Sequence, residues 1–364
     1  MNLEENLEEL QKFLLSLYDH SPGTASVMAD RQIRRAVKKH KLRVDEHKDK
    51  SKRIAIYSPT RKWFEVTDDW RTDNEATAMM GAICGDVAGS VYERHNVKFW
   101  LDKKHLIKPK AKFTDDTVMT CAVAEGLRNG LSQLPQDWET DPKAEAVLFR
   151  SVQKAMQYYG RQYLKVGYGK RFLSWILSPN PLPYQSIGNG SAMRVSYAGW
   201  IARSLEEAEK LAEITARVTH NTAEGIAGAK VVAGCIFLLR NGSTKEEIHA
   251  YANRFFTMDF SLREIRKDYS FDGTCSGSVP VAIKAFLEGK SFVDVIAKAI
   301  WVGGDSDTIA AIAGSIAEVI YPIPQGFRGR VIDRVDKFLL NTVVEAVDFA
   351  YKRLPEEEQS KFLR

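Results

Sequence analysis

The feature that most restricts the fold of this 364-residue chain is its helical periodicity after about residue 74. Alanine and leucine recur there at the spacing of an α-helix, and the alternation typical of half-buried strands is nearly absent. We therefore predict a mainly α protein with a compact all-helical domain over residues 75–364. The expected helices span residues 75–91, 116–130, 143–160, 191–203, 205–219, 222–240, 244–255, 278–288, 291–301, 308–320 and 328–352.

Residues 1–74 follow another pattern and predict a small α/β N-terminal extension. Leucines at helical spacing favour an amphipathic helix over residues 3–19. A basic segment follows, in which 11 Lys and Arg face 3 Asp and Glu between Arg31 and Arg53. Two β-branched and aromatic runs then flank Ser-Pro-Thr-Arg within residues 53–66 and predict a hairpin.

The charge balance argues against a nucleic-acid-binding core. The formal net charge is +5, and the basic segment alone carries 11 − 3 = +8, which leaves about −3 for the rest of the chain. No apolar run reaches the roughly 18–20 residues that span a membrane, and the acidic first 30 residues do not resemble a signal peptide. We expect a cytoplasmic protein whose four cysteines are reduced and mostly buried.

Two acidic motifs, FTDDTVMT at residues 113–120 and GGDSDT at 303–308, each precede a helix-like run. Within a regular helix, neither pair of aspartates could point the same way. In the turn before a helix they can converge, and the glycines of the second motif allow a tight turn. Four carboxylates in one place repel unless cations neutralise them, and oxygen ligands without His or Cys suit Mg²⁺ or Mn²⁺. The alternative for each motif is a simple helix cap.

Two further stretches and one histidine are compatible with a ligand site, although each also has a structural explanation. The run GAICGDVAGSVYE at 81–93 places glycines inside a helix-like segment, which suggests close packing or ligand approach. The loop SIGNGSAMR at 186–194 is rich in small residues and enters a helix, as phosphate-binding loops do, although an ordinary turn has the same composition. His220 lies between two predicted helices, where a capping role is the simpler interpretation.

Taken together, these motifs resemble those of the ADP-ribosylglycohydrolases, a family of all-helical hydrolases with two metal ions. The matching stretches, in family order, are GDVAGSVYE, TDDTVMT, GYG, GNGSAMR, THNTAEG, FDGTCSGSVPVAIKAFLEG and GGDSDTIAAIAGSIAE. They cover roughly residues 78–325 and leave the extension outside the resemblance. The implied fold is all-helical, and the implied cofactors are two divalent cations, Mg²⁺ or Mn²⁺.

The resemblance also implies site residues. The metal ligands would be Thr114, Asp115, Asp116, Asp305, Asp307 and Thr308. The residues around ADP-ribose would be Gly167, Tyr168, Gly169, Ser186, Gly188, Asn189, Gly190, Ser191, Met193 and His220. The general base would be either Glu93, which matches a glutamate on a mobile segment near the metals, or a metal-bound carboxylate such as Asp116.

The implied activity is metal-dependent hydrolysis that removes ADP-ribose from modified protein side chains, with the amino-acid linkage left open. The alternative is a binding module that holds ADP-ribosylated or ADP-ribosylating proteins without turnover. Residues 1–74 would be either a structural collar or an arm that binds a cognate ADP-ribosylating toxin, for which basic charge and aromatic residues such as Trp63 and Phe64 are suited. Nucleic acid is the less favoured partner.

Overall fold

The computed structural model describes residues 43–45, 55–57, 78–96, 98 and 101–355. By its internal contacts the chain divides into two units, residues 1–76 and 77–364. In the first unit, β1 (Arg43–Asp45) pairs with β2 (Ala55–Tyr57) in an antiparallel arrangement, with Val44 opposite Ile56. The helix predicted over residues 3–19 lies outside the described residues.

The predicted hairpin is only partly correct. Its first run, from residue 53, contains β2, but β2 pairs with β1, a strand that we had assigned to the basic segment. The second run, which we expected to be the partner of β2, lies outside the described residues. Val44 and Ile56 are β-branched and lie in short runs with strand propensity. Either β1 or the expected second run could therefore form backbone hydrogen bonds to β2, and in the structure the partner is β1, which a longer connection joins to β2.

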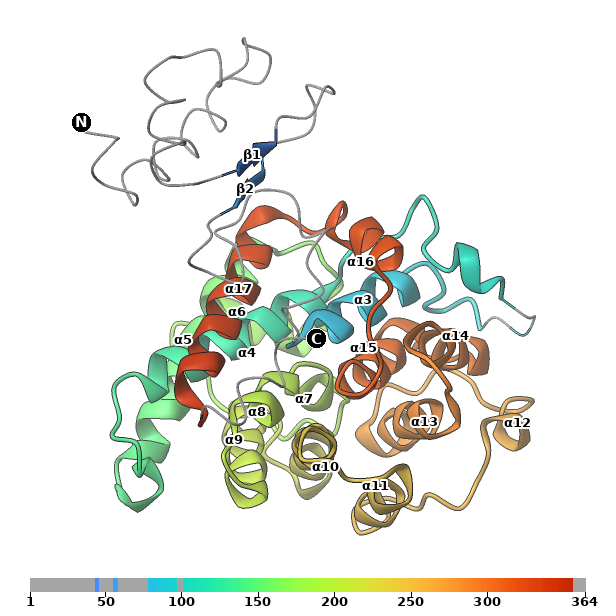
Figure 1. Cartoon of the computed structure of the whole chain (residues 1–364). Helices are drawn as coiled ribbons and strands as arrows, with labels where there is room; N and C mark the ends of the chain where they lie inside the picture. Colours follow the sequence, from blue (N-terminus) through green and yellow to red (C-terminus); the bar gives the residue numbers. More distant parts are fainter. Residues whose placement is uncertain (1–42, 46–54, 58–77, 97, 99–100, 356–364) are drawn as a thin grey trace. The chain divides into compact units, whose positions relative to one another are not determined.

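The regular elements of the second unit are all helices within the described residues, as predicted (Figure 1). Its helices are α3 (Met80–Gly89), α4 (Asp115–Leu131), α5 (Ala144–Gln162), α6 (Lys170–Leu177), α7 (Gly190–Met193), α8 (Ser196–Ile201), α9 (Leu205–Arg217), α10 (Ala223–Arg240), α11 (Lys245–Ala252), α12 (Leu262–Ile265), α13 (Cys275–Glu288), α14 (Phe292–Val302), α15 (Ser306–Ala317), α16 (Gln325–Ile332) and α17 (Lys337–Arg353).

Two of the predicted helices are each divided in the structure. The segment expected at 191–203 forms α7 and α8, and the segment expected at 328–352 forms α16 and α17. The second division has a clear cause, because the Asp336 carboxylate accepts a hydrogen bond from the Leu339 amide at 3.1 Å and so starts a new helix. The short helices α6 and α12 were not predicted.

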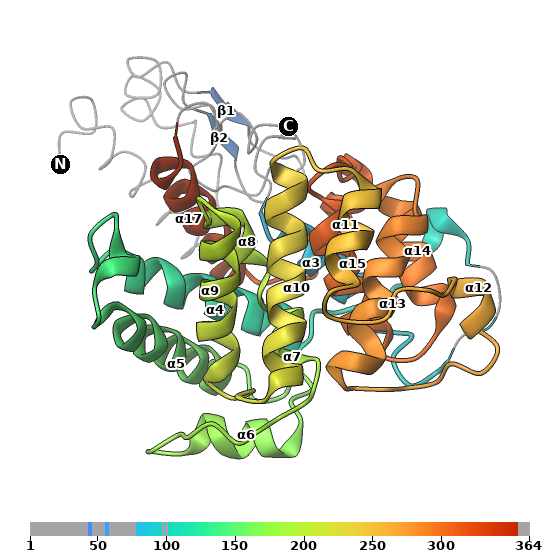
Figure 2. The same ribbon diagram turned by 90° about the horizontal axis from the view of Figure 1, so that it is seen from below.

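Helix α15 lies at the centre of the unit and packs directly against α3 (Figures 1 and 2). Three glycines, Gly81, Gly85 and Gly89, repeat every four residues on the face of α3 that meets α15. A Cβ on Gly85 would overlap the Ala310 carbonyl group and lie 2.5 Å from the Ala311 amide nitrogen. The glycines of the 81–93 run therefore allow backbone-to-backbone packing, one of the two explanations offered by the sequence.

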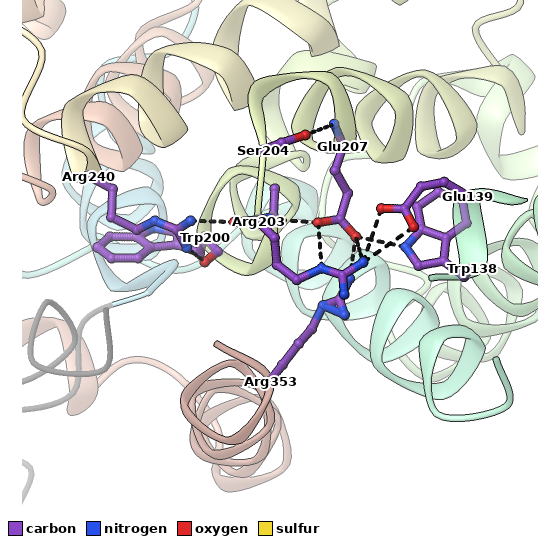
Figure 3. Close-up of polar contacts among 9 residues, drawn as sticks. Trp138, Glu139, Trp200, Arg203, Ser204, Glu207, Arg240 and Arg353 are labelled. Atoms are coloured by element: carbon purple, nitrogen blue, oxygen red, sulfur yellow. Dashed lines mark hydrogen bonds and ion pairs between the residues drawn. The ribbon is translucent and has the colours of Figure 1, made fainter. Parts of the chain in front are cut away.

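A buried charge cluster fixes the end of α17, as Figure 3 shows. The Glu207 carboxylate, on α9, accepts hydrogen bonds from Trp138 Nε1 at 2.7 Å, from the Arg203 amide at 2.6 Å and from Arg353 Nη2. Burial alone would raise the pKa of Glu207, but Arg353 and the hydrogen bonds hold that pKa below its ordinary value. Arg353 thereby ties α17 to α9 through a compensated charge.

No helix in the described part of the chain combines the length and the apolar character needed to cross a membrane. The four cysteines, Cys84, Cys121, Cys235 and Cys275, are all buried and unpaired, as predicted.

The contact between α3 and α15 generates a stability prediction. Gly85→Ala is expected to lower the free energy of unfolding by about 3 kcal/mol or more, because the added methyl group meets backbone atoms that cannot move away alone. Chemical denaturation of the two proteins measures the difference.

The matched control is Gly326→Ala, at an exposed position on α16 where an added Cβ meets nothing within 4 Å. This variant should be neutral or stabilised by up to about 1 kcal/mol. Equal stability of the Gly85 variant and the wild-type protein would contradict the close packing of α3 on α15.

Candidate active site

The first acidic motif forms the beginning of α4. Thr114 is the N-cap residue, and its hydroxyl accepts a hydrogen bond from the Asp116 amide at 3.3 Å. Asp115 and Asp116 follow in the first turn, where their negative charge favours the positive end of the helix. Asp116 is buried, whereas Asp115 is partly exposed.

The second acidic motif forms the beginning of α15. Gly303 and Gly304 have φ values of 90° and 77°, which glycine adopts without strain, and they reverse the chain between α14 and α15. Asp305 is the N-cap residue of α15, and Asp307 lies in its first turn. Both aspartates are buried. The glycines thus provide the tight turn that the sequence indicated.

The two helix N-termini face each other. Thr308 Oγ1, on α15, donates a hydrogen bond to Asp116 Oδ2, on α4, at 3.2 Å. The two residues are 192 positions apart in the sequence. The convergence of the two motifs, expected from their position before helices, is therefore present in the fold.

A fifth carboxylate, that of Asp86, adjoins the four aspartates of the two motifs and was not predicted from the sequence. Asp86 lies on α3 and is fully buried. It accepts hydrogen bonds from the Thr114 amide at 2.9 Å, from Thr114 Oγ1 at 2.7 Å, from the Thr117 amide at 3.0 Å and from Thr117 Oγ1. Asp86 therefore satisfies free amides at the start of α4 and fixes that helix against α3.

Carboxylate oxygens of Asp86, Asp116 and Asp307 lie within 4.8 Å of one another. Asp116 Oδ1 is buried and makes no hydrogen bond within the described residues. Burial, reinforced by the neighbouring carboxylates, raises the pKa of Asp116 and of Asp307 well above the ordinary value. An orphaned carboxylate oxygen in a group of hard donors fits a divalent cation such as Mg²⁺ or Mn²⁺.

The remaining aspartates of the motifs border the same cluster. Although Asp115 is partly exposed, the surrounding protein removes much of the water around its carboxylate, and this desolvation, followed by the charge of Asp86, raises the pKa of Asp115 to about 7. Burial also raises the pKa of Asp305, whose Oδ2 accepts a hydrogen bond from Asn189 Nδ2 at 2.8 Å. Asn189 belongs to the loop before α7, so this bond connects the predicted phosphate-binding loop to the acidic cluster.

A cavity of about 510 Å³ opens beside the cluster, a size typical of small-molecule sites. All six predicted metal ligands line it, and so does Glu93. Of the residues predicted around ADP-ribose, those that line the cavity are Gly167, Gly169, Ser186, Asn189, Gly190, Met193 and His220.

Three predicted ligand-binding residues do not line this cavity. Tyr168 turns its ring edge-on to Phe172, with ring centroids 5.3 Å apart. Ser191 is buried, and its hydroxyl donates to the Gly225 carbonyl at 2.7 Å, which holds α7 against the start of α10 (Figure 2). Gly188 forms an isolated β-bridge with Thr274, and its amide donates a hydrogen bond to the Ser186 hydroxyl at 3.1 Å.

Glu93 lies in the turn that follows α3, at the edge of the cavity. Its side chain is 32% exposed and forms an ion pair with Arg94 at 3.1 Å. The second candidate base, Asp116, is instead buried within the carboxylate cluster. The two candidates therefore occupy clearly different environments.

The cavity also contains residues that the sequence analysis missed. Its cations are Arg94, Lys112, Lys170, Arg171 and Arg194, and its additional aromatic residues are Phe172 and Phe271. The Arg171 guanidinium lies 4.9 Å from the centre of the Tyr184 ring. Lys170 and Arg171 directly follow the GYG motif. Their position in the sequence could therefore have predicted positive charge at this wall of the cavity.

Known proteins share both the sequence pattern and the fold. The chain is 25% identical to ADP-ribosylarginine hydrolase Tri1 of Pseudomonas putida, over 71% of this chain and 73% of that protein. It is 24% identical to ADP-ribosylhydrolase ARH3 of Mus musculus, over 68% of this chain and 83% of that protein. A solved ADP-ribosylglycohydrolase-related protein complex has the same fold, with a TM-score of 0.51, 22% identity and coverage of 78% of this chain and 99% of that chain.

The sequence profile of the ADP-ribosylglycohydrolase family matches residues 68–356, which include the whole helical unit described above from α3 to α17. Both acidic motifs, the loop before α7 and Glu93 fall within this match. The chain belongs to the ADP-ribosylglycohydrolase family.

Proposed function

We propose that this protein is a metal-dependent hydrolase that removes ADP-ribose from modified protein side chains. The observation that carries the proposal is the group of three buried aspartates, contributed by α3, α4 and α15, beside a cavity of about 510 Å³. The named activities of the Pseudomonas putida and Mus musculus relatives support it. A binding module would not need an orphaned carboxylate oxygen at the cavity wall.

We place two divalent cations, Mg²⁺ or Mn²⁺, at the acidic cluster. The residues that would hold them are Thr114, Asp115, Asp116, Asp305, Asp307 and Thr308, with Asp86 as an additional candidate. When bound, such cations orient sugar hydroxyls and lower the pKa of a water molecule. Thr308 holds Asp116 in place by its hydrogen bond, and Asn189 does the same for Asp305.

The rest of the cavity suits the other parts of ADP-ribose. The diphosphate would lie along the 186–191 loop, where backbone amides can donate to anionic oxygens. Lys170 and Arg171 add positive charge at the same wall. The adenine would stack on Tyr184, whose ring already contacts a guanidinium. Gly167 and Gly169 leave room for a ribose, since neither carries a side chain.

We assign the role of general base to Glu93. The reaction breaks the bond between C1″ of the ribose and the protein side chain, with positive charge developing on the sugar. Glu93 is at the cavity edge and accessible, so it can take a proton from the attacking water, whose oxygen bonds to C1″, and return that proton to the departing side-chain atom as its bond to C1″ breaks. Asp116 is buried and hydrogen-bonded to Thr308, which suits a ligand better than a base that moves.

The experiment that tests the proposal compares substrates in which ADP-ribose is linked to different amino acids. The purified protein is incubated with substrates ADP-ribosylated on arginine or on serine, with Mg²⁺, with Mn²⁺ or with a chelator. Mass spectrometry then measures free ADP-ribose. We expect release from at least one linkage only when the cation is present. Tight binding of the modified substrates without release from either linkage would support the binding module instead.

The N-terminal extension is a separate proposal. We propose that residues 1–74 bind a cognate ADP-ribosylating toxin, which the helical domain would then counteract as an immunity protein. Support comes from the concentrated basic charge between Arg31 and Arg53 and from the position of the family match, which begins only at residue 68.

Deletion of residues 1–70 is predicted to abolish tight binding to a co-encoded transferase and to leave hydrolysis intact, since α3 begins only at Met80. Pull-down with the transferase and the release assay measure the two properties, and a nucleic-acid binding assay serves as a third arm. Loss of hydrolysis, or unfolding of the truncated protein, would make the extension part of the catalytic fold.

Asp307→Asn is predicted to remove stabilisation by Mg²⁺. A cation at about 100 times its dissociation constant stabilises the wild-type protein by roughly 2.7 kcal/mol. The variant should lose most of this gain, and without metal it should be more stable than the wild-type protein, because one of several mutually repelling carboxylates is neutral. Thermal unfolding with and without Mg²⁺ measures both effects.

The control for this experiment is Asp259→Asn, an exposed aspartate outside the cavity. It should leave the stability and its Mg²⁺ dependence unchanged. If Asp307→Asn retained the full Mg²⁺ effect, Asp307 would not be a metal ligand.

The metal-free protein is predicted to lose stability as the pH rises from about 5 to 8. The folded-state pKa of Asp115 is raised to about 7, and those of Asp86, Asp116, Asp305 and Asp307 are also raised. The stabilisation is therefore complete below the unfolded pKa of about 3.9 and disappears as the pH passes the folded value. Mg²⁺ should flatten this dependence of the melting temperature, and identical slopes with and without Mg²⁺ would exclude a metal at the cluster.

Glu93→Gln is predicted to lower kcat by about 100-fold or more and to change the affinity for free ADP-ribose little. The substitution keeps the shape of the side chain but removes the base. Single-turnover kinetics and calorimetric titration with ADP-ribose separate the two quantities. An unchanged kcat would remove Glu93 from the mechanism and leave Asp116 as the candidate base.

A further inference from the structure

Arg194, at the end of α7, is a buried cation that forms no ion pair within the described part of the chain. It is 1% exposed and lines the cavity. Its Nη2 donates to the Thr215 carbonyl at 3.2 Å and to Thr219 Oγ1 at 2.8 Å. Burial lowers the pKa of Arg194 to about 10, so the side chain is still charged at neutral pH. Because burying a cation without a counter-ion is costly, a role beyond packing is expected.

The neutral partner of Arg194, the hydroxyl of Thr219, is shared with His220. Thr219 is fully buried in the turn after α9, and its Oγ1 lies 2.6 Å from His220 Nδ1. Arg194, Thr219 and His220 thus form a continuous hydrogen-bonded chain. The hydrogen-bonded series begins at Arg194, whose guanidinium can only donate because it has no acceptor atom.

The direction of the second hydrogen bond follows from counting protons. A threonine hydroxyl has one proton, and Thr219 Oγ1 already accepts from Arg194. If His220 Nδ1 also donated to this oxygen, the buried hydroxyl proton would have no acceptor among the described residues, which is unfavourable. If Thr219 donates to Nδ1, both the hydroxyl proton and the imidazole nitrogen have a partner. The proton of the neutral imidazole then resides on Nε2.

The Nε2 side of the ring faces the predicted phosphate-binding loop. A Cβ on Gly190 would lie 3.4 Å from His220 Nε2, and a Cβ on Gly188 would lie 3.6 Å from the same atom. The absence of side chains at both positions leaves space in front of this nitrogen. On its other side, His220 lies near Tyr184, with ring centroids 6.2 Å apart.

We propose that Arg194 and Thr219 are positioning residues that hold His220 as the Nε2–H tautomer, so that it presents one fixed N–H donor to a phosphate oxygen of the ligand beside Gly190. Burial and the charge of Arg194 also lower the pKa of His220 well below its ordinary value, which keeps the ring neutral. The donor is therefore constant over the physiological pH range. The choice of ligand group rests on the proposed function.

The test is the tautomer itself, read by nuclear magnetic resonance. The full-length protein is labelled with ¹⁵N at its seven histidines, and the spectrum of a His220→Asn variant identifies the signals of His220. In the wild-type protein with Mg²⁺, we expect the proton on Nε2. Thr219→Val keeps the side-chain shape but removes the hydroxyl that links Arg194 to His220, so His220 should shift towards a mixture of tautomers. The dissociation constant of ADP-ribose should then rise by about tenfold.

Two matched variants separate positioning from general damage. Thr219→Ser restores the hydroxyl and should restore both the tautomer and the affinity. Thr215→Val makes the same substitution one turn earlier, where the buried hydroxyl bonds to the Ala212 carbonyl instead, and should leave His220 unchanged.

Finding the wild-type proton on Nδ1, or an unchanged tautomer and affinity in Thr219→Val, would overturn the proposal. If the wild-type protein did not bind ADP-ribose at all, the proposed function would fail. The tautomer measured in the free protein would still decide whether Arg194 and Thr219 position His220. Failure of this proposal and failure of the proposed function are therefore distinguishable.

Discussion

The candidate site depends first on the close contact between α3 and α15. The glycine face of α3 lets the two helix backbones touch, and a side chain at Gly89 would collide with the first turn of α15 beside Asp307. This proximity brings Asp86, on α3, within reach of Asp307. The same contact fixes where α3 ends and the turn bearing Glu93 begins. A looser crossing, with larger residues between the helices, would separate the carboxylates.

The protein accommodates its buried carboxylates in two different ways. At Glu207, arginines and a tryptophan compensate the carboxylate, and its pKa stays below the ordinary value. At the acidic cluster, the charges of Asp86, Asp116 and Asp307 face one another, and burial raises their pKa values. The first arrangement stabilises the fold by itself. The second leaves the carboxylates without a counter-charge among the described residues, and in the proposed function bound cations supply it.

The helical fold could be predicted because most helices are long and strongly periodic. The prediction failed where helices are short or interrupted: α6 and α12 were missed, and the break before Asp336 was overlooked although this residue is a standard N-cap type. The acidic motifs were found because each places two aspartates within three residues at the start of a helix-like run. Asp86 was missed because, in a glycine-rich buried helix, glycine spacing explained the stretch without it. Ser191 and Tyr168 show a further limit, since a motif gives the position of a side chain in the sequence and not its direction in space.

The central claim is that the helix N-termini of α4 and α15, held by Asp86, form a metal site. Crystals of the full-length protein grown with Mn²⁺ would test it directly through an anomalous difference map. The account predicts anomalous peaks in contact with the carboxylates of Asp116 and Asp307, inside the cavity that Glu93 borders. Ordered Asp86, Asp116 and Asp307 with no peak at saturating Mn²⁺, or with peaks only elsewhere on the protein, would contradict it.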